Sequence, residues 1–231
     1  MKEKPDIVFL SYDEPNAESN FKHLLARYDR AKRLHGVTGV GRANVLTAEV
    51  SDTDWYYLID ADSTVLKSFS LDSIPNNLSS RKIIVWSAIN PANGLTYGYG
   101  GLKLCHRQIV RTLNPQNRDV FTTSDGAVEF SRVVASVTHF NSSPYHAWRA
   151  AFREMIALTG MRQLGMSADG ILSRQKAWQN PRLLARHRRW IRLGASDACE
   201  IIEFTGIEDA QKRIHDPSWC RSQFIRRHQK R

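Results

Sequence analysis

Short apolar runs alternate with amphipathic segments along the first part of the chain. The runs at residues 6–11 and 55–59 are continuously apolar and end in polar clusters, which is typical of strands buried on both faces of a sheet. Residues 17–28 and 42–50 place apolar side chains at helical spacing, with a short segment at 31–35 between them. This order predicts an α/β fold with a doubly wound, mainly parallel sheet.

The later part of the chain extends this pattern and then changes it. Residues 83–88 are predicted to form a further strand, and 94–104 a glycine-rich hairpin or loop that leads into one. From residue 143 the character becomes helical: residues 144–159 are amphipathic and are followed by Gly160, which predicts a long helix that ends there.

Two polar clusters follow predicted strands. Residues 11–14 (Ser11, Tyr12, Asp13, Glu14) follow the first strand, and Asp60-Ala61-Asp62 follows the run at 55–59. Ligands of such sheets bind beyond the carboxyl ends of the strands, so we expect both clusters on one rim. Mg²⁺ and Mn²⁺ commonly bind through one or two carboxylates together with substrate phosphates, so Asp60 and Asp62 are candidate metal ligands.

The D-x-D motif by itself is a weak signal. It is expected by chance roughly once in a chain with this content of aspartate, and Asp52-Thr53-Asp54 is a second example. The second triplet precedes a predicted strand, whereas Asp60 and Asp62 follow one, and this context favours metal binding at the latter pair. The alternative is a capping or turn role, and Asp13 and Glu14 would equally serve the turn before the first helix.

A glycine-rich loop precedes the second predicted helix. It runs from His35 through Gly36 and Val37 to Arg42, and its main-chain amides together with Arg42 could hold a pyrophosphate at the helix N-terminus. The loop lacks the Gly-Lys-Ser/Thr ending of a Walker loop and is not a G-x-G-x-x-G turn. Tyr12, which follows the first predicted strand, could stack on a nucleobase.

Positive charge is concentrated in the last two-fifths of the chain. The formal net charge is +10, with 16 basic and 15 acidic side chains in residues 1–140 but 17 and 8 in residues 141–231. An excess that is segregated in this way favours a polyanionic partner over a general role in solubility, which is the alternative.

One basic segment, residues 170–196, contains no acidic residue. Asn180-Pro181 and Gly194 predict a helix between them, on which Arg182, Arg186 and Arg189 form a cationic stripe while Leu183, Leu184, Trp190 and Ile191 pack on the other side. Such a stripe suits the phosphate backbone of double-stranded DNA. The alternatives are a solvated helix face or a surface for acidic lipid. The candidate DNA-binding residues are Arg174, Lys176, Arg182, Arg186, Arg188, Arg189 and Arg192.

The three cysteines, Cys105, Cys199 and Cys220, have neither disulfide-framework nor zinc-site spacing, which favours a reducing, cytoplasmic setting. The apolar stretch near the N-terminus is too short for a signal peptide. No run of 18 apolar residues occurs, so we expect no transmembrane segment.

Several motifs together carry a family resemblance: FLSYDEPNAESNF, KRLHGVTGV, WYYLIDAD, NPANGLTYGYGGLKL, TTSDG, THFNSSPYHAWRAAFRE and IHDPSW. They resemble a family of bacteriophage glycosyltransferases with the GT-A fold, over residues 6 to about 220. The resemblance implies that residues 1–145 form a nucleotide-sugar-binding core and 146–231 a basic, helical acceptor-binding part of the same domain. It also implies that Asp60 and Asp62 hold Mn²⁺ or Mg²⁺ on the donor diphosphate. The implied nucleotide-sugar-binding residues are Ser11, Tyr12, Asp13, Glu14, His35, Gly36, Val37, Arg42, Asp60, Ala61, Gly100 and Gly101.

An inverting transferase needs a group that takes the proton of the acceptor hydroxyl. The candidates are Asp125, Glu154 and His139, each of which also has an ordinary interpretation: a turn residue, a helix ion pair and a core histidine. A histidine often completes the metal shell in GT-A enzymes, which makes His139 or His215 a candidate third ligand. A retaining enzyme needs no base at this position.

Together these features predict a metal-dependent glycosyltransferase that moves a sugar from a nucleotide sugar to a hydroxymethylated pyrimidine base in phage DNA. UDP is expected from the fold alone, 5-hydroxymethylcytosine is an example of the acceptor, and the setting would be the cytoplasm of an infected bacterium. Two alternatives stay open. One is a GT-A glycosyltransferase that acts on a glycan, lipid or protein, and the other is a non-catalytic nucleic-acid-binding protein. The donor sugar and the oligomeric state have no signal in the sequence.

Overall fold

The computed structural model describes residues 4–75, 78, 82–116, 127–161 and 167–228. The chain forms two compact units. Unit 1 comprises Met1–Ile89 and Thr96–Thr138, and unit 2 comprises Asn90–Leu95 and His139–Arg231. This division separates the charge almost completely: unit 1 has a net charge of +1 and unit 2 of +9.

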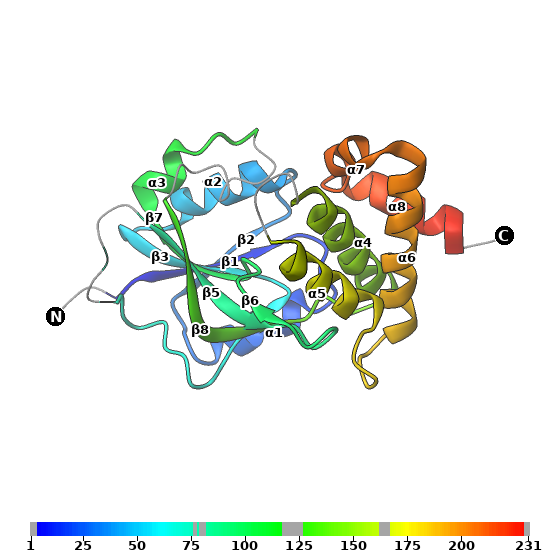
Figure 1. Cartoon of the computed structure of the whole chain (residues 1–231). Coiled ribbons are helices and arrows are strands. Elements are labelled where there is room, and N and C mark those ends of the chain that lie inside the picture. The colour runs from blue at the N-terminus through cyan, green and yellow to red at the C-terminus, as the bar shows by residue number, and fades with distance from the viewer. Residues whose placement is uncertain (1–3, 76–77, 79–81, 117–126, 162–166, 229–231) are drawn as a thin grey trace. The chain divides into compact units, whose positions relative to one another are not determined.

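Unit 1 is built on a sheet of eight strands among the described residues, in the order β2-β1-β3-β7-β5-β8-β4 with β6 beside β5 (Figure 1). The predicted alternation of strands and helices is confirmed. The elements are β1 (Asp6–Ser11), α1 (Ala17–Leu25), β2 (Ala31–His35), α2 (Val40–Val50), β3 (Trp55–Asp60), β4 (Ser63–Val65), β5 (Ile83–Ile89), β6 (Thr96–Tyr97), β7 (Leu102–His106), α3 (Arg107–Thr112) and β8 (Val128–Thr138).

The sheet is mixed, which confirms an α/β fold with a mixed sheet flanked by helices. β1 pairs in parallel with both β2 and β3, whereas β7 lies antiparallel between β3 and β5. The chain leaves β1 to reach β2 on one side and then returns to β3 on the other. The strand order therefore reverses at β1 and β3, and ligands of open α/β sheets bind beyond the carboxyl ends of the strands at such a reversal.

The apolar runs of β1 and β3 are buried on both faces, as their sequences predicted. Ile7 and Phe9 pack in the layer that contains α1, while Val8 packs in the layer that contains α2 and α3. Figure 1 shows these helices on opposite faces of the sheet. Because alternate residues of a strand point to opposite faces, the two-layer covering needs an uninterrupted apolar sequence. This packing fixes where the carboxyl ends of β1 and β3 emerge.

Unit 2 is helical in the residues that the structure describes. Its elements are α4 (Pro144–Met161), α5 (Ala168–Gln179), α6 (Arg188–Thr205), α7 (Ile207–Arg213) and α8 (Pro217–His228). The core contains Trp148, Phe152 and Ile191, all fully buried. The indole Nε1 of Trp148 donates a hydrogen bond to Asp197 Oδ2 at 2.6 Å, which ties α4 to α6. α4 runs through Gly160, one residue beyond the predicted stop.

The prediction of a helix from Asn180-Pro181 to Gly194 is wrong. Asn180 ends α5, and His187 has φ 60°, a left-handed conformation that interrupts any helix before α6 begins at Arg188. Gly194 lies inside α6, where a Cβ atom would overlap the carbonyl oxygen of Trp148 in α4. The glycine thus permits a close approach of two helices instead of ending one.

The predicted cationic stripe therefore does not form on a single helix. Arg182 and Arg186 lie in the turn between α5 and α6, and only Arg189 is helical. Ile191 is fully buried as expected, but Leu183 and Leu184 are 83% and 97% exposed instead of packed.

Candidate functional site

The two polar clusters meet at the carboxyl ends of β1 and β3, as predicted. Leu10 and Asp60 are register partners in the parallel pair, and the Ala61 amide donates a hydrogen bond to the Leu10 carbonyl at 2.9 Å. Asn20 of α1 donates from Nδ2 to the Ala61 carbonyl at 2.8 Å and so holds the chain just past β3. The segments that bear Glu14, Asp60 and Asp62 therefore leave the sheet at its point of strand-order reversal. We call these three side chains the carboxylate rim.

Each aspartate of the carboxylate rim has a specific partner. The Lys103 ammonium, on the neighbouring strand β7, lies 3.0 Å from Asp60 Oδ1 and 3.2 Å from Oδ2, and Lys103 is only 4% exposed. The Ser63 hydroxyl donates to Asp62 Oδ1 at 3.2 Å and lies 3.0 Å from the Thr138 hydroxyl. Asp60 is thus neutralised in part, whereas the contact of Asp62 with Ser63 orients it without supplying charge.

The carboxylate rim carries more negative charge than its surroundings balance. Burial and, after it, the charges of Asp60 and Glu14 raise the pKa of Asp62 to about 7, although the Ser63 hydrogen bond and the Lys103 charge act in the opposite direction. Burial also raises the pKa of Glu14, although the Tyr12 amide donates to Glu14 Oε2 at 2.8 Å. Carboxylates that repel one another in this way favour a cation among them.

The donor set fits a hard divalent cation that takes its remaining ligands from elsewhere. In the described part of the chain, no group of three or more His, Cys, Asp or Glu side chains is arranged to hold a metal ion by itself. Mg²⁺ and Mn²⁺ are commonly held by one or two carboxylates, with phosphate oxygens and water completing the shell. Asp60 and Asp62 match this incomplete kind of site, because both are oxygen donors and are separated by one residue.

The candidate nucleoside side lies at the ends of β1 and β2. Ser11 Oγ accepts a hydrogen bond from Arg33 Nε at 2.9 Å and lies 2.9 Å from His35 Nδ1. The Gly36 amide donates to the Ser11 carbonyl at 3.1 Å, with Gly36 at φ 75°. The Tyr12 side chain is 46% exposed beside them, so a planar ring can reach its face. Asp13 is exposed, Val37 is partly buried, and Arg42 is exposed in the first turn of α2.

Gly100 and Gly101 are needed by the local backbone and packing. Gly100 has φ 82°, which favours glycine. The Asp60 amide donates to the Gly101 carbonyl at 2.9 Å, and a Cβ atom on Gly101 would overlap the Ser63 hydroxyl. Gly101 therefore lets β7 close against the residues that position Asp60 and Asp62.

The sequence patterns did not identify four residues that support the carboxylate rim: Asn20, Ser63, Lys103 and Thr138. Only Lys103 could have been noticed in the sequence, because a lysine within the apolar run Leu102–Cys105 is unusual unless an acidic partner neutralises it. Asn20, Ser63 and Thr138 are buried polar side chains whose partners come from distant segments. No local pattern marks such pairings.

Two of the candidate general bases, Glu154 on α4 and His139, belong to unit 2, and the third, Asp125, lies outside the described residues. His215, a candidate third metal ligand, also belongs to unit 2. Burial lowers the pKa of His139, which keeps its imidazole neutral and able to accept a proton near pH 7. The guanidinium of Arg153 lies 3.4 Å from His215 Nδ1.

The candidate DNA-binding residues all lie in unit 2. Arg174 and Lys176 are on α5, Arg182 and Arg186 are in the turn that follows, and Arg188, Arg189 and Arg192 are on the first turns of α6. Arg188 Nε donates to the Pro181 carbonyl at 3.2 Å, so this arginine braces the turn. The cations are spread over two helices and their connection.

Unit 2 also has an aromatic pocket of about 400 Å³ that the sequence did not reveal. The Arg221 guanidinium lies 4.4 Å from the centre of the Tyr145 ring, and His228 Nε2 lies 2.7 Å from Asp197 Oδ2. The pocket is lined by Ser143, Pro144, Tyr145, Trp190, Arg221, Phe224 and His228.

Comparisons with known proteins give likenesses in structure only. No family model and no curated protein matches the chain. The chain is similar to HddC from Yersinia pseudotuberculosis, with 9% identity and a TM-score of 0.41 over 63% of this chain and 97% of that one. It is also similar to the mannosyltransferase PcManGT from Pyrobaculum calidifontis in complex with GDP-Man and Mn²⁺, with 12% identity and a TM-score of 0.49 over 96% and 84% of the two chains.

A third likeness is to a glycosyltransferase involved in the glycosylation of the major capsid of PBCV-1. Its identity is 13% and its TM-score 0.31, over 46% of this chain and 62% of that one. Because all three scores are below 0.5, these likenesses assign no role to any residue of this chain. Separately, none of the described helices combines the length and the apolar character that a membrane span requires.

Proposed function

We propose that this protein is a metal-dependent glycosyltransferase of the GT-A type, which moves a sugar from a nucleotide sugar to a hydroxymethylated pyrimidine base in DNA. One observation carries the proposal: the carboxylate rim lies at the carboxyl ends of β1 and β3, where the strand order reverses, and its negative charge is incompletely balanced. A nucleotide diphosphate with its divalent cation is the ligand class that fits this position and this charge.

Each group on the rim has a part in holding the donor. Asp60 and Asp62 would hold Mn²⁺ or Mg²⁺, which neutralises the diphosphate as it leaves the sugar. Lys103 positions Asp60, and Ser63 positions Asp62. Tyr12 offers an exposed ring to the nucleobase, while the amides near Gly36 and the Arg42 guanidinium are donors for phosphate oxygens.

The acceptor half of the proposal is supported by charge. Unit 2 has a net charge of +9, and residues 170–196 contain no carboxylate that would repel DNA. Of the candidate bases, His139 has a pKa that burial lowers, so its imidazole is unprotonated at neutral pH, which is the form that can act as a base. The family resemblance in the sequence supports the nucleotide-sugar donor, and the DNA acceptor rests on the charge of unit 2.

The function is tested by a panel of nucleotide sugars, UDP-sugars first and GDP-sugars next, with Mn²⁺ and three duplex DNAs. The DNAs contain 5-hydroxymethylcytosine, 5-hydroxymethyluracil or unmodified bases, and the modified nucleosides are identified by mass. We expect one donor to give a mass increase of one sugar on a hydroxymethylated base, and none on unmodified DNA. Transfer to a glycan, lipid or protein with no transfer to any DNA would contradict the acceptor assignment.

A second candidate acceptor is a lipid-linked one at an anionic membrane. The two exposed leucines among the arginines of unit 2 favour this possibility over a soluble glycan. It predicts transfer to a lipid-linked acceptor in vesicles and none to DNA.

A further inference from the structure

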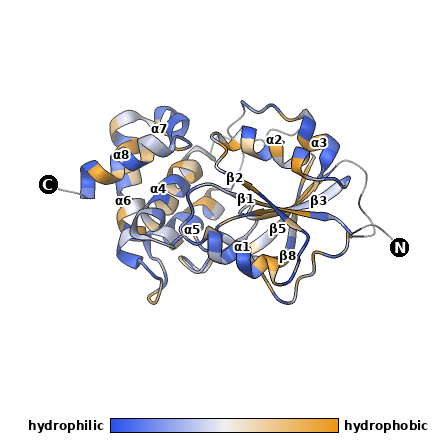
Figure 2. Cartoon of the chain, turned by 180° about the vertical axis from the view of Figure 1, so that it is seen from behind, coloured by the Kyte–Doolittle hydropathy of each residue, from blue (hydrophilic) through white to orange (hydrophobic). Residues whose placement is uncertain are grey.

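Two leucines occupy the tip of a tight turn between α5 and α6. The Ala185 amide donates to the Arg182 carbonyl at 3.0 Å, which makes Leu183 and Leu184 the central residues of a β-turn. They are 83% and 97% exposed, among the highest values for large apolar side chains in the described residues. Figure 2 shows the turn as a projection of unit 2 with an orange tip beside blue residues. We call residues 182–185 the leucine turn.

This placement has no explanation in folding. The central positions of tight turns favour Gly, Pro, Asn, Asp and Ser, and apolar side chains there lose the burial that would stabilise them. Single exposed leucines are common on protein surfaces, but two adjacent ones at a projecting tip form a patch that marks a contact surface. The leucine turn therefore has the character of a site that buries its apolar tip in a partner.

The leucine turn is held firmly at its base. The Arg182 amide donates to the Ala92 carbonyl at 3.2 Å, and Asn141 Nδ2 donates to the Arg186 carbonyl at 2.9 Å. Arg188 reaches back to the Pro181 carbonyl, and the Arg188 amide donates to the Ala185 carbonyl at 3.1 Å. A tip that is braced on both sides enters a partner without the entropy cost of ordering a free loop.

The residues that flank the tip are cations. Arg182 and Arg186 are both exposed, Arg189 follows on the first turn of α6, and the nearest acidic residues in sequence are Asp169 and Asp197. An apolar wedge between arginines matches the way proteins part the base steps of a duplex, with apolar side chains between bases and cations on the phosphates.

We propose that Leu183 and Leu184 form a wedge that enters duplex DNA and takes the place of the base extruded for glycosylation. Arg182 and Arg186 contact the phosphates on the two sides of the opened step. The inference rests on the proposed function for the identity of the extruded base. Extrusion costs stacking and pairing energy, and an apolar filler reduces this cost by keeping water out of the space that the base leaves.

The test compares three variants on paired and unpaired DNA. In the double variant Leu183→Ala/Leu184→Ala the wedge is removed, and the fold should survive because both side chains are exposed. In Leu183→Met/Leu184→Met the apolar volume is kept. Phe204→Ala is the matched control, because Phe204 is an 88% exposed apolar side chain on α6 outside the turn. A duplex with 2-aminopurine next to the hydroxymethylated base reports unstacking by fluorescence, and sugar transfer is measured on the duplex and on the corresponding single strand.

We expect the alanine double variant to lose the fluorescence rise and about 10-fold to 100-fold of its transfer rate on the duplex, a range set by an unstacking cost of a few kcal/mol. On the single strand, which needs no opening, its rate should stay within about 2-fold of the unmodified protein. The methionine variant and Phe204→Ala should behave like the unmodified protein on both substrates.

Three results would overturn the wedge. The first is transfer on duplex DNA at an undiminished rate in the alanine variant, which would leave the proposed function standing. The second is an equal loss on duplex and single strand. The third is loss of binding to vesicles of phosphatidylserine and phosphatidylcholine with DNA unstacking unchanged, which would assign the leucine turn to a membrane. A leucine-dependent fluorescence rise without transfer to any acceptor would instead support the wedge and contradict the proposed function.

Discussion

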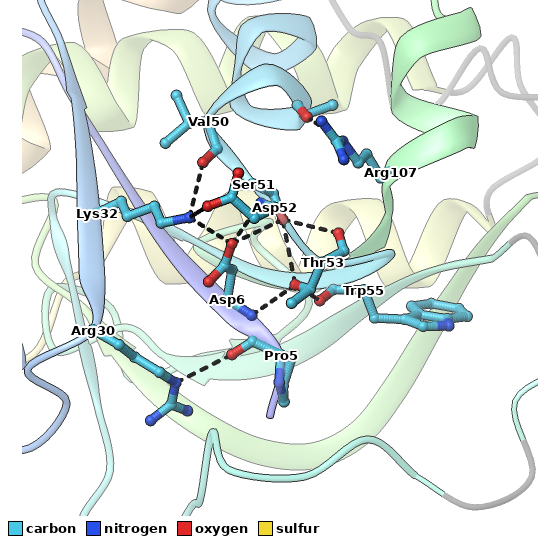
Figure 3. A network of polar contacts seen from close by, with 11 residues as sticks. Pro5, Asp6, Arg30, Lys32, Val50, Ser51, Asp52, Thr53, Trp55 and Arg107 are labelled. Atoms are coloured by element: carbon cyan, nitrogen blue, oxygen red, sulfur yellow. Dashed lines mark hydrogen bonds and ion pairs between the residues drawn. The ribbon is translucent and has the colours of Figure 1, made fainter. Parts of the chain in front are cut away.

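Aspartates with a neighbouring lysine lie at both ends of β1 and β3, but their surroundings differ between the two ends. At the amino end, Asp6 accepts hydrogen bonds from Lys32 Nζ at 2.7 Å and from the Asp52 amide at 2.6 Å (Figure 3). At the carboxyl end, the Lys103 ammonium contacts Asp60, which belongs to the carboxylate rim together with Asp62 and Glu14. A D-x-D triplet stands at each end of β3, but at the carboxyl end burial and neighbouring carboxylates raise the pKa of Asp62, whereas at the amino end Asp6 and Asp52 both contact the Lys32 ammonium.

The pKa values express this difference in one quantity. Burial raises the pKa of Asp6, but the hydrogen bonds from Lys32, Asp52 and Thr53 outweigh it and leave the pKa lowered. Burial and neighbouring carboxylates raise the pKa of Asp62 to about 7. A carboxylate with a lowered pKa stabilises the fold, whereas one with a raised pKa is stabilised only by a cation or a proton from outside. The amino end is structural, and the raised pKa at the carboxyl end supports our proposal that this end binds a ligand.

The largest expected effect separates the two triplets by activity. Asp60→Asn and Asp62→Asn should each lower the rate of sugar transfer by about 10³-fold, because a lost metal ligand removes several kcal/mol of charge stabilisation. Asp52→Asn is the matched control at the other end of β3 and should leave the rate within about 2-fold. Initial rates at saturating Mn²⁺ measure the difference. An equal fall in the transfer rate in all three variants would contradict the functional difference between the two ends of β3.

The next effect is on stability at the amino end. Asp6→Asn should lower the free energy of unfolding by about 2 kcal/mol at pH 7, because charge-assisted hydrogen bonds to a largely buried carboxylate are lost. Since the folded pKa of Asp6 is lowered, its contribution is present above the unfolded pKa near 3.8 and is lost as the pH falls through the folded value. Urea titrations should therefore show the two proteins converging as the pH falls below the unfolded pKa of 3.8. A constant gap across this range would rule out the ionic origin.

A smaller effect of opposite sign is expected at the carboxyl end. At pH 8 without divalent cations, Asp62→Asn should raise the free energy of unfolding by about 1 kcal/mol, because one of three mutually repelling carboxylates is removed. Thermal unfolding of the two proteins in the presence of a chelator checks this. Destabilisation by the variant would show that Asp62 is already satisfied within the fold.

The smallest effect concerns the outer ion pair of the amino end. Asp52 Oδ2 lies 2.6 Å from Lys32 Nζ, but the Asp52 side chain is largely exposed. Asp52→Asn should therefore change the free energy of unfolding by about 0.5 kcal/mol or less, and less still in 0.5 M NaCl, in the range of exposed salt bridges. A loss as large as that of Asp6→Asn would mean that Asp52 is part of the buried core of this network.

The sequence predicted unit 1 well because its signals are local. Continuous apolar runs mark β1 and β3, and the order of strands and helices places residues 11–14 and 60–62 on one rim. Lys103 and Ser63 escaped prediction because each acquires its role from a partner on another strand. A strand pattern predicts at which end of the sheet a carboxylate lies. It does not predict which cation from a distant strand contacts that carboxylate.

The segment after Asn180 was mispredicted for a related reason. Asn180-Pro181 is a good helix start and Gly194 a good stop when only neighbours in sequence are considered. In the fold, Gly194 admits the backbone of α4 at Trp148, and His187 adopts a left-handed conformation, which is uncommon for residues other than glycine and which the capping pattern did not indicate. Tertiary packing thus overrides the capping pattern, and it exposes two leucines that the pattern had buried.

The most direct test of the central claim is the binding of UDP and GDP by calorimetry, with and without Mn²⁺, to the unmodified protein, Asp60→Asn and Asp52→Asn. The account predicts binding of at least one nucleotide that depends on Mn²⁺, is lost in Asp60→Asn and is unchanged in Asp52→Asn. Equal binding with and without Mn²⁺, or equal binding by all three proteins, would contradict the assignment of the carboxylate rim to a metal-bound diphosphate.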